Sequence, residues 1–241
     1  MKGLFHKFLD VLIPPVCTLC NEPVSENATL CPECFSKLRF ITKPHCKICG
    51  RPFEFSVSEE TICAECLVSQ PLFTKARSVV IYDDMARKLV LAFKNGDKLY
   101  IAPLLTKLMA QVASEFIEEV DVVMPIPLHR WRLLKRKYNQ SAILARKLAR
   151  HFHKTYNPDV LKRVRSTPNQ GHLSARERKK NVANAFRVRK GETVKGKTVL
   201  LVDDVLTTGA TTNECSRMLL KAGVKQVYVL TFASTVLDKT E

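Results

Sequence analysis

The chain has 241 residues, of which 46% are hydrophobic and 26% are charged, as expected for one medium α/β domain with a small appendage. No apolar run approaches the roughly 18 residues that a membrane-spanning helix needs, which argues against an integral membrane protein. The formal net charge of +16 favours a polyanionic partner, whether a diphosphate, a nucleic acid or an anionic surface, but charge alone does not choose among them.

The first thirteen residues form a segment of their own. Apolar residues recur at helical spacing, as in Leu4, Phe8 and Leu12, so we expect an amphipathic helix over residues 1–13. No uncharged apolar stretch with a small-residue cleavage site is present, so we expect a cytoplasmic protein rather than a secreted one. Two interpretations of the helix stay open: it packs on the body of the protein, or it makes peripheral contact with a membrane surface.

Eight of the nine cysteines form four pairs, each with two residues between its members. The pairs are Cys17 and Cys20, Cys31 and Cys34, Cys46 and Cys49, and Cys63 and Cys66. This spacing lets both sulfurs face one point, and two pairs supply the four thiolates of a tetrahedral zinc site. Four pairs predict two zinc ions in a module over residues 14–70. Because four sulfurs leave no position for water, we expect a structural role.

The spacing leaves the grouping of the cysteine pairs open. The first four and the last four cysteines can each bind one ion, or the pairs can be interleaved. Disulfides are the alternative, and the expected reducing compartment argues against them. His45 could replace a ligand, but we interpret it as a bystander.

After residue 70, β-branched runs alternate with amphipathic helical stretches. Strands are predicted at 76–82, 120–126, 197–203 and 226–233, and helices at 85–93, 102–119, 139–153 and 211–222. This alternation predicts one α/β domain over residues 71–241, with a parallel sheet covered by helices on both faces. The polar stretch 165–183 lacks a clean period and is predicted to be a long loop that leads into a helix. Cys215 is predicted to be a core residue.

The strongest chemical signal follows the strand at 197–203. That strand ends in Asp203 and Asp204, and a hydroxyl-rich loop with Gly209 then opens a helix. Ligands of open α/β sheets bind outside the carboxyl ends of the strands, and the amides at a helix start bind anions. Two acids beside an anion site would repel a bare phosphate. We therefore interpret them as acceptors for the hydroxyls of a sugar that lies between them and the phosphate.

A second motif competes for a phosphate. Residues 191–198 satisfy the Walker A pattern, and residues 200–204 imitate a Walker B strand. The Walker A pattern requires a helix directly after it, whereas here a β-branched strand follows. We interpret the match as a coincidence.

The stretch from Val199 to Thr211 resembles the signature motif of type I phosphoribosyltransferases, which bind 5-phosphoribosyl-1-diphosphate (PRPP) with Mg²⁺. The resemblance implies the type I phosphoribosyltransferase fold and makes Asp203 and Asp204 the catalytic pair that holds the ribose hydroxyls. It assigns the 5-phosphate to Thr207, Thr208, Gly209, Ala210 and Thr211. It also implies that Mg²⁺ is held largely by oxygens of the ligand.

The order of parts along the chain is similar to that of the ComF (ComFC) competence family, in which a double zinc ribbon precedes a transferase-like domain. The shared parts are the paired cysteines, residues 124–127, residues 138–141, Gln170, Leu173, Ser174, Arg178, Asn181, Ala185, Phe186 and the PRPP motif. The resemblance places a diphosphate loop at Pro125 and Ile126. It also implies that the polar segment closes over the diphosphate, with Arg176 and Arg178 as donors to the leaving group. The chain departs from the family at Lys137, where the family usually has glycine.

Three hypotheses about function follow. Family resemblance implies a cytosolic, PRPP-binding protein of natural transformation that handles single-stranded DNA. Arg130, Trp131, Arg132 and Tyr138 combine cations with aromatic faces, which suits a single strand, although Trp131 can equally anchor a loop. The second hypothesis is an active phosphoribosyltransferase, whose acceptor the sequence does not identify. The third is a zinc-ribbon interaction module that docks a DNA-processing partner such as a helicase.

Overall fold

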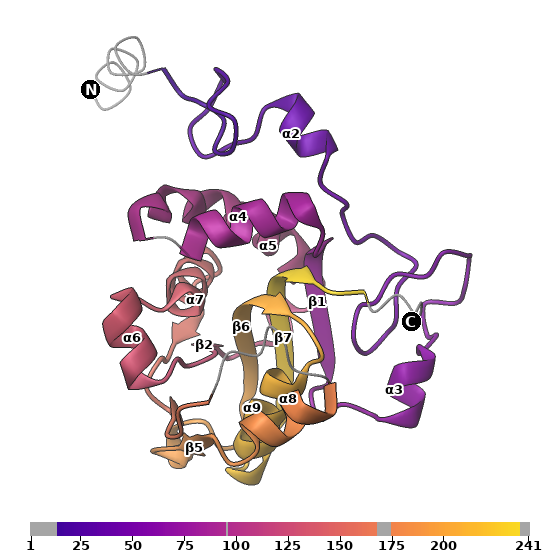
Figure 1. Cartoon of the computed structure of the whole chain (residues 1–241). Helices are drawn as coiled ribbons and strands as arrows, with labels where there is room; N and C mark the ends of the chain where they lie inside the picture. The colour runs from indigo at the N-terminus through magenta and orange to yellow at the C-terminus, as the bar shows by residue number, and fades with distance from the viewer. Residues whose placement is uncertain (1–13, 95, 168–174, 237–241) are drawn as a thin grey trace.

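Five parallel strands form the central sheet of the structure, a computed structural model that describes residues 14–94, 96–167 and 175–236. The strand order is β1-β7-β6-β2-β3, and each adjacent pair is parallel (Figure 1). The strands are β1 (Lys75–Ile81), β2 (Val122–Pro125), β3 (Thr155–Tyr156), β6 (Thr198–Leu206) and β7 (Gln226–Ser234). Most residues of β6 and β7 are buried, which explains why these strands are nearly continuous apolar runs in the sequence.

Two hydrophobic clusters cover the two faces of this sheet. On one face, Leu200 and Val202 pack with α4 (Asp84–Lys94), α5 (Ala102–Ala113) and α7 (Gln140–His151). On the other face, Val199 and Leu201 pack with α9 (Ala210–Lys221), whose Cys215 is fully buried as expected. Alternate residues of β6 enter opposite clusters because successive side chains of a strand point to opposite faces. The predicted parallel sheet with helices on both faces is therefore confirmed.

Several elements differ from the prediction. The helix expected over residues 102–119 ends at Ala113, because Phe116 leaves the helical conformation at φ −144° and its ring is buried in the core. Within the predicted loop 165–183, the second half is α8 (Ala175–Val182). The remaining elements are α2 (Pro32–Ser36), α3 (Ala64–Val68), η1 (Gly96–Ile101), η2 (Ile117–Glu119), α6 (Arg130–Arg136), β4 (Leu161–Arg163), β5 (Phe186–Val188) and η3 (Gly191–Thr193). The helix expected over residues 1–13 lies outside the described residues and stays a prediction.

The cysteine module consists of two similar units. Each has a short antiparallel bridge near its first cysteine pair, Val16 with Pro23 and His45 with Pro52, and a short helix that begins after its third cysteine. In Figure 1 the first unit lies above α4 and α5, and the second lies beside β1 with α3 at the right.

The main chain of the module covers the outer edge of β1. Phe40 bridges Val80, and the amide of Ala76 donates to the carbonyl of Ile48 at 2.7 Å. An exposed edge of a sheet is a site of unwanted pairing, so the module protects the sheet as well as carrying its own cysteines. Gly50 makes the close approach possible: its φ is +72°, and a Cβ there would lie 2.7 Å from the carbonyl oxygen of Ala76.

The Walker-like segment does not lead into a helix. Gly191–Thr193 is a single 3-10 turn, and Thr198 is already the first residue of β6. The coincidence inferred from the sequence is confirmed. Among the described residues, no helix combines the length and apolar character needed to cross a membrane.

Candidate functional site

The acidic pair and the loop after it form one side of a cavity of about 260 Å³. Asp203 and Asp204 lie near the carboxyl end of β6, and Gly209 adopts φ +69° as the chain enters α9. Because that left-handed conformation favours glycine, the loop turns sharply and presents the first amides of α9 at its end. Of the residues assigned to the 5-phosphate, Thr207, Gly209 and Thr211 line the cavity, whereas Thr208 in the loop and Ala210, the first residue of α9, are not part of its lining.

The two carboxylates have different partners. The Ser141 hydroxyl donates to Oδ1 of Asp203 at 2.7 Å, and Lys94 Nζ lies 2.9 Å from Oδ2 of Asp204. Burial, and then the neighbouring charge of Asp204, raises the pKa of Asp203 to about 7, although the Ser141 bond opposes this. Asp203 therefore changes its protonation state near neutral pH, while Asp204 has a cation beside it.

The corner after β2 forms a second wall of the cavity. Ile126 lines it, and Pro125, the last residue of β2, lies directly before Ile126. The side chain of Asn139 donates to the carbonyl of Ile126 at 3.0 Å and the amide of Ile126 donates to Val202 at 2.9 Å, so this corner is held from both sides. The loop predicted to bind the diphosphate is thus next to the acidic pair.

Five cationic residues also line the cavity. They are Lys94, Arg132, Arg136, Arg163 and Arg178, against the two acids Asp203 and Asp204. Arg178 was expected here from the sequence. The side chain of Arg176 lies outside the described residues, so its role stays a prediction. A wall with five cations and two acids suits a ligand that is a strong anion and also carries hydroxyls.

Arg163 and Arg136 are site residues that the sequence prediction missed. Arg163 lies on β4, hydrogen-bonds to the Thr167 hydroxyl and has its guanidinium 5.3 Å from the ring centroid of Phe186. Arg132 donates to the carbonyl of Thr167 at 2.7 Å, so one threonine holds two guanidinium groups at the cavity. Nothing local in the sequence marks Arg163, because β4 reaches the site only through tertiary packing.

Buried polar atoms without partners indicate that the cavity suits a polar ligand. Gln140, which lines it, is 2% exposed, and its Nε2 finds no hydrogen-bond partner among the described residues. The Nε of Arg163 and the hydroxyl of Thr208 are likewise buried and without a hydrogen-bond partner among the described residues. An unsatisfied buried donor costs roughly 1–3 kcal/mol, and a ligand rich in oxygen acceptors would remove this cost. The carboxylate oxygens are hard donors that fit Mg²⁺, an ion that needs few protein ligands when a phosphate ligand carries it.

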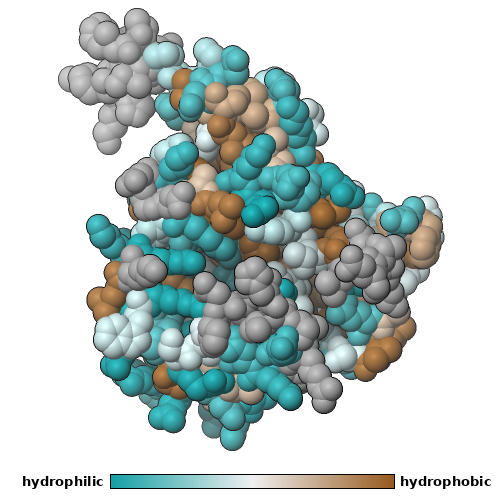
Figure 2. Space-filling model, viewed as in Figure 1, coloured by the Kyte–Doolittle hydropathy of each residue, from teal (hydrophilic) through white to brown (hydrophobic). Residues whose placement is uncertain are grey.

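The four residues proposed for DNA contact do not form one surface. The Arg130 guanidinium lies 5.4 Å from the ring centroid of Trp131, which is 61% exposed. Arg132 turns instead into the cavity wall, and the Tyr138 hydroxyl donates to the carbonyl of Phe93 at 3.0 Å. Figure 2 shows hydrophobic residues at the left edge of the molecule over α6, where Leu133 and Leu134 are also exposed.

The departure from the family at Lys137 has a structural explanation. Lys137 is the C-cap of α6 and adopts φ +65°, the left-handed conformation that glycine adopts most readily. The lysine therefore keeps the backbone conformation suited to glycine, at a strain of roughly 1 kcal/mol.

The cysteines form two separate four-sulfur sites. Within each group the sulfurs all lie within 4.8 Å of one another, the first being Cys17, Cys20, Cys31 and Cys34 and the second Cys46, Cys49, Cys63 and Cys66. The structure thus selects sequential rather than interleaved grouping. A hydrogen bond from Cys49, together with backbone amides, lowers the pKa of Cys46 to about 4, so a thiolate is present there at neutral pH. Four convergent thiols fit a structural zinc ion.

Comparisons with known proteins agree with this geometry. Residues 8–67 match the family model of the double zinc ribbon domain, and residues 96–240 match that of the phosphoribosyl transferase domain. The fold and the site thus define a phosphoribosyltransferase-domain protein with an N-terminal double zinc ribbon.

The relatives identify the family more closely. Competence protein F of Haemophilus influenzae is 31% identical over 216 residues, 87% of this chain and 91% of the relative. DNA utilization protein YhgH of Escherichia coli is 30% identical over 230 residues, 93% of this chain and 99% of the relative. Competence protein ComFC of Bacillus subtilis is 28% identical over 227 residues, 86% of this chain and 90% of the relative. The chain belongs to the ComF family.

Solved structures show more partial likenesses. Glutamine PRPP amidotransferase from B. subtilis is 22% identical with a TM-score of 0.41, over 60% of this chain and 30% of that one. PRPP synthetase from Mycobacterium smegmatis is 19% identical with a TM-score of 0.35, over 56% of this chain and 34% of that one.

Proposed function

We propose that this protein binds PRPP with Mg²⁺ in the cavity at the end of β6, and that it acts in the cytoplasm on single-stranded DNA taken up during natural transformation. One observation carries the first part: an acidic pair, a glycine-turned loop at a helix start and a cationic wall line the same cavity.

Each part of PRPP has a chemical counterpart in this cavity. The carboxylates of Asp203 and Asp204 accept hydrogen bonds from the ribose hydroxyls, and the loop around Gly209 takes the 5-phosphate. The diphosphate then faces Arg132 and Arg163, whose fixed guanidinium groups suit phosphate oxygens. Bound Mg²⁺ would neutralise part of the diphosphate charge.

Calorimetry with Mg²⁺ and PRPP tests this proposal. We expect the wild type to bind and the Asp203→Asn/Asp204→Asn variant to lose at least 100-fold in affinity, because amides accept ribose hydroxyls less well and no longer attract the metal. Asp159→Asn is the matched control, since that acid is exposed and pairs with Lys162. Unchanged affinity in a folded double variant would show that the ligand binds elsewhere.

The same experiment separates a binding protein from an enzyme. Arginines beside the expected diphosphate could stabilise the leaving group, which favours transferase activity as the second candidate function. Diphosphate release, measured with ammonia and with nucleobases as acceptors, would establish turnover. Binding without release under all of these conditions would leave PRPP as a regulatory ligand.

The DNA part of the proposal is supported by the names of the relatives, the net charge of +16 and the exposed Trp131 beside Arg130. Bases stack on exposed aromatic rings, and cations beside them attract the backbone. We expect labelled oligothymidine to bind with a steep salt dependence, and Trp131→Ala to weaken binding by roughly tenfold. Leu134→Ala, an exposed apolar neighbour on the same helix, is the control. Equal effects of both variants would contradict a stacking role.

The proposed zinc module spans residues 14–70, and the proposed transferase domain spans residues 71–241. The zinc module is also a proposed docking site for a DNA-processing partner such as a helicase. Leu67 and Val68 on α3 are strongly exposed apolar residues, which favours a protein contact there. Leu67→Ser/Val68→Ser should weaken binding to a purified competence helicase while leaving PRPP affinity unchanged.

Cytoplasmic location is supported by the eight free cysteines of the two four-sulfur sites.

A further inference from the structure

Lys94 places a fixed positive charge on the acidic pair. Its Nζ lies 2.9 Å from Oδ2 of Asp204, and the two side chains are only 27% and 14% exposed. Both residues line the same cavity, although Lys94 comes from the end of the first helix of the transferase domain. This contact is therefore created by the fold and not by neighbouring sequence.

The end of α4 is held in place, so Lys94 does not depend on a freely moving backbone. Phe93, directly before it, is fully buried, and its carbonyl accepts a hydrogen bond from Tyr138 at 3.0 Å. Lys94 is also the last residue of α4, where the helix dipole stabilises a positive charge. The fold itself therefore positions a cation in the site.

The charge of Lys94 offsets the electrostatic repulsion between the two carboxylates of the acidic pair. Two adjacent carboxylates in a partly buried cavity repel each other and attract either protons or divalent ions. The pKa of Asp203 is raised by burial first and by Asp204 second, while the charge of Lys94 opposes the rise. Ser141 stabilises Asp203 by a hydrogen bond but brings no charge.

We propose that Lys94 is a built-in counter-ion, which pairs with Asp204 in the ligand-free protein and transfers to a phosphate oxygen of the ligand when the metal complex of PRPP binds. This inference rests on the proposed function for the identity of the ligand. It implies that a free divalent ion is kept off the acidic pair, so that the metal enters together with the ligand. Asp204 is then released to accept a ribose hydroxyl.

Two titrations of Lys94→Met test this mechanism. The first titration adds Mn²⁺ alone and detects binding by electron paramagnetic resonance. At Mn²⁺ concentrations on the order of 1 mM, we expect negligible binding to the wild type and measurable binding to the variant, because the acidic pair of the variant has lost its cation. The second uses Mg²⁺ and PRPP in calorimetry, where we expect roughly a tenfold loss of affinity because one cation–phosphate contact is removed.

Two further variants control for folding and for general charge. Lys94→Arg should restore exclusion of Mn²⁺ and most of the PRPP affinity. Lys88→Met removes an exposed lysine from the same helix and should behave as the wild type in both titrations. A merely structural role of Lys94 would not produce a new Mn²⁺ site.

Equal Mn²⁺ binding by the wild type and Lys94→Met would overturn the counter-ion, and so would unchanged PRPP affinity in the variant. Failure of the wild type to bind PRPP at all would contradict the proposed function instead. In that case the Mn²⁺ titration still decides whether Lys94 guards the acidic pair.

Discussion

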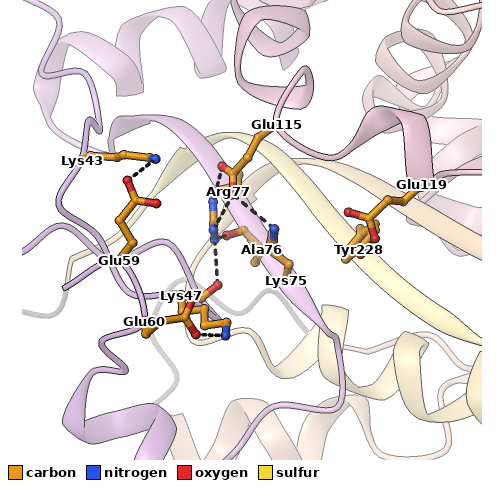
Figure 3. Close-up of polar contacts among 10 residues, drawn as sticks. All are labelled: Lys43, Lys47, Glu59, Glu60, Lys75, Ala76, Arg77, Glu115, Glu119 and Tyr228. Carbon is orange, nitrogen blue, oxygen red and sulfur yellow. Dashed lines mark hydrogen bonds and ion pairs between the residues drawn. The ribbon is translucent and has the colours of Figure 1, made fainter.

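The Arg77 guanidinium on β1 forms two hydrogen bonds of 2.8 Å with the Glu115 carboxylate and one of 3.2 Å with the carbonyl of Lys47 (Figure 3). Glu115 follows α5, whereas Lys47 belongs to the second cysteine unit, so Arg77 connects this unit to β1 and to the end of α5. Lys75 lies 3.3 Å from the same carboxylate. Arg77 is almost fully buried, and these contacts satisfy its charge.

Replacing Arg77 with methionine should destabilise the protein. The substitution leaves Glu115 with Lys75 as its cation and opens the contact to Lys47. We expect a loss of about 2 kcal/mol, less than for a fully buried pair because Glu115 remains accessible to water. Urea denaturation measures it. Lys107→Met, which breaks an exposed 3.9 Å pair with Glu26, should change stability by less than about 0.5 kcal/mol. Equal effects of both variants would refute the connecting role of Arg77.

Gly50→Ala should disturb the docking of the second cysteine unit on β1. A Cβ at Gly50 would lie 2.7 Å from the backbone oxygen of Ala76, so one of the two chains must move, at a cost of roughly 2–3 kcal/mol. Gly196→Ala is the matched control, because its φ is also positive at +71° but its Cβ would meet nothing within 4 Å. That control should cost only the backbone strain of about 1 kcal/mol. Thermal unfolding of both variants distinguishes the close approach from the strain.

Ionisation of Asp203 should destabilise the ligand-free protein. Its pKa is raised from 3.8 to about 7, so the folded state holds the proton more tightly than the unfolded chain. The contribution to stability is therefore present below about pH 4 and is lost as the pH rises to about 7. We expect ionisation of Asp203 to lower the free energy of unfolding by about 2 kcal/mol. This is less than the full pKa shift implies, because water in the open cavity screens the charge. Denaturant unfolding of the wild type and Asp203→Asn at pH 5 and pH 8 measures the difference, which should favour the variant more strongly at the higher pH.

The affinity for PRPP should follow the opposite trend in pH. An ionised Asp203 is the better acceptor for a ribose hydroxyl, so affinity should rise between pH 6 and pH 8. Asp203→Asn should flatten this dependence. A rise of equal size in that variant would assign the titration to another group.

Zinc analysis should find two ions per chain, one in each four-sulfur site. Cys20 is exposed, whereas Cys46 is fully buried in the unit that covers β1. Cys20→Ser should therefore leave one ion and a stable transferase domain, and Cys46→Ser should leave one ion and lower the stability of the whole chain. Metal content by mass spectrometry and thermal unfolding test this difference. Equal stability of the two variants would mean that the second unit does not support the sheet.

Arg163→Met should weaken PRPP binding by roughly tenfold without unfolding the protein, because the residue supplies a cation to the cavity wall. Arg165→Met is the comparison. Arg165 is exposed and donates to the carbonyls of Asn181 and Ala183, outside the cavity lining. Calorimetry with Mg²⁺ and PRPP should separate the two variants, and a larger effect of Arg165 would shift the diphosphate site toward α8.

The sequence by itself determined the features that depend on short spacing. Two residues between paired cysteines let both sulfurs face one point, and Asp203 and Asp204 stand only a few residues before Gly209 and the helix that follows, so the acidic pair and that loop are close by sequence alone. The alternation of apolar runs with amphipathic stretches also predicted the parallel sheet, because a strand that is buried on both faces is apolar at nearly every residue.

Only the tertiary structure decided what lies opposite that loop. Lys94, Ser141 and Arg163 come from α4, α7 and β4, and their meeting with the acidic pair depends on how those elements pack around the sheet. Tyr138 shows the same dependence on tertiary packing. Its aromatic ring beside several cations in the sequence suited a nucleic-acid surface, whereas packing directs its hydroxyl to the end of α4. Local patterns specify which side chains an element offers, but non-local packing selects the partners they receive.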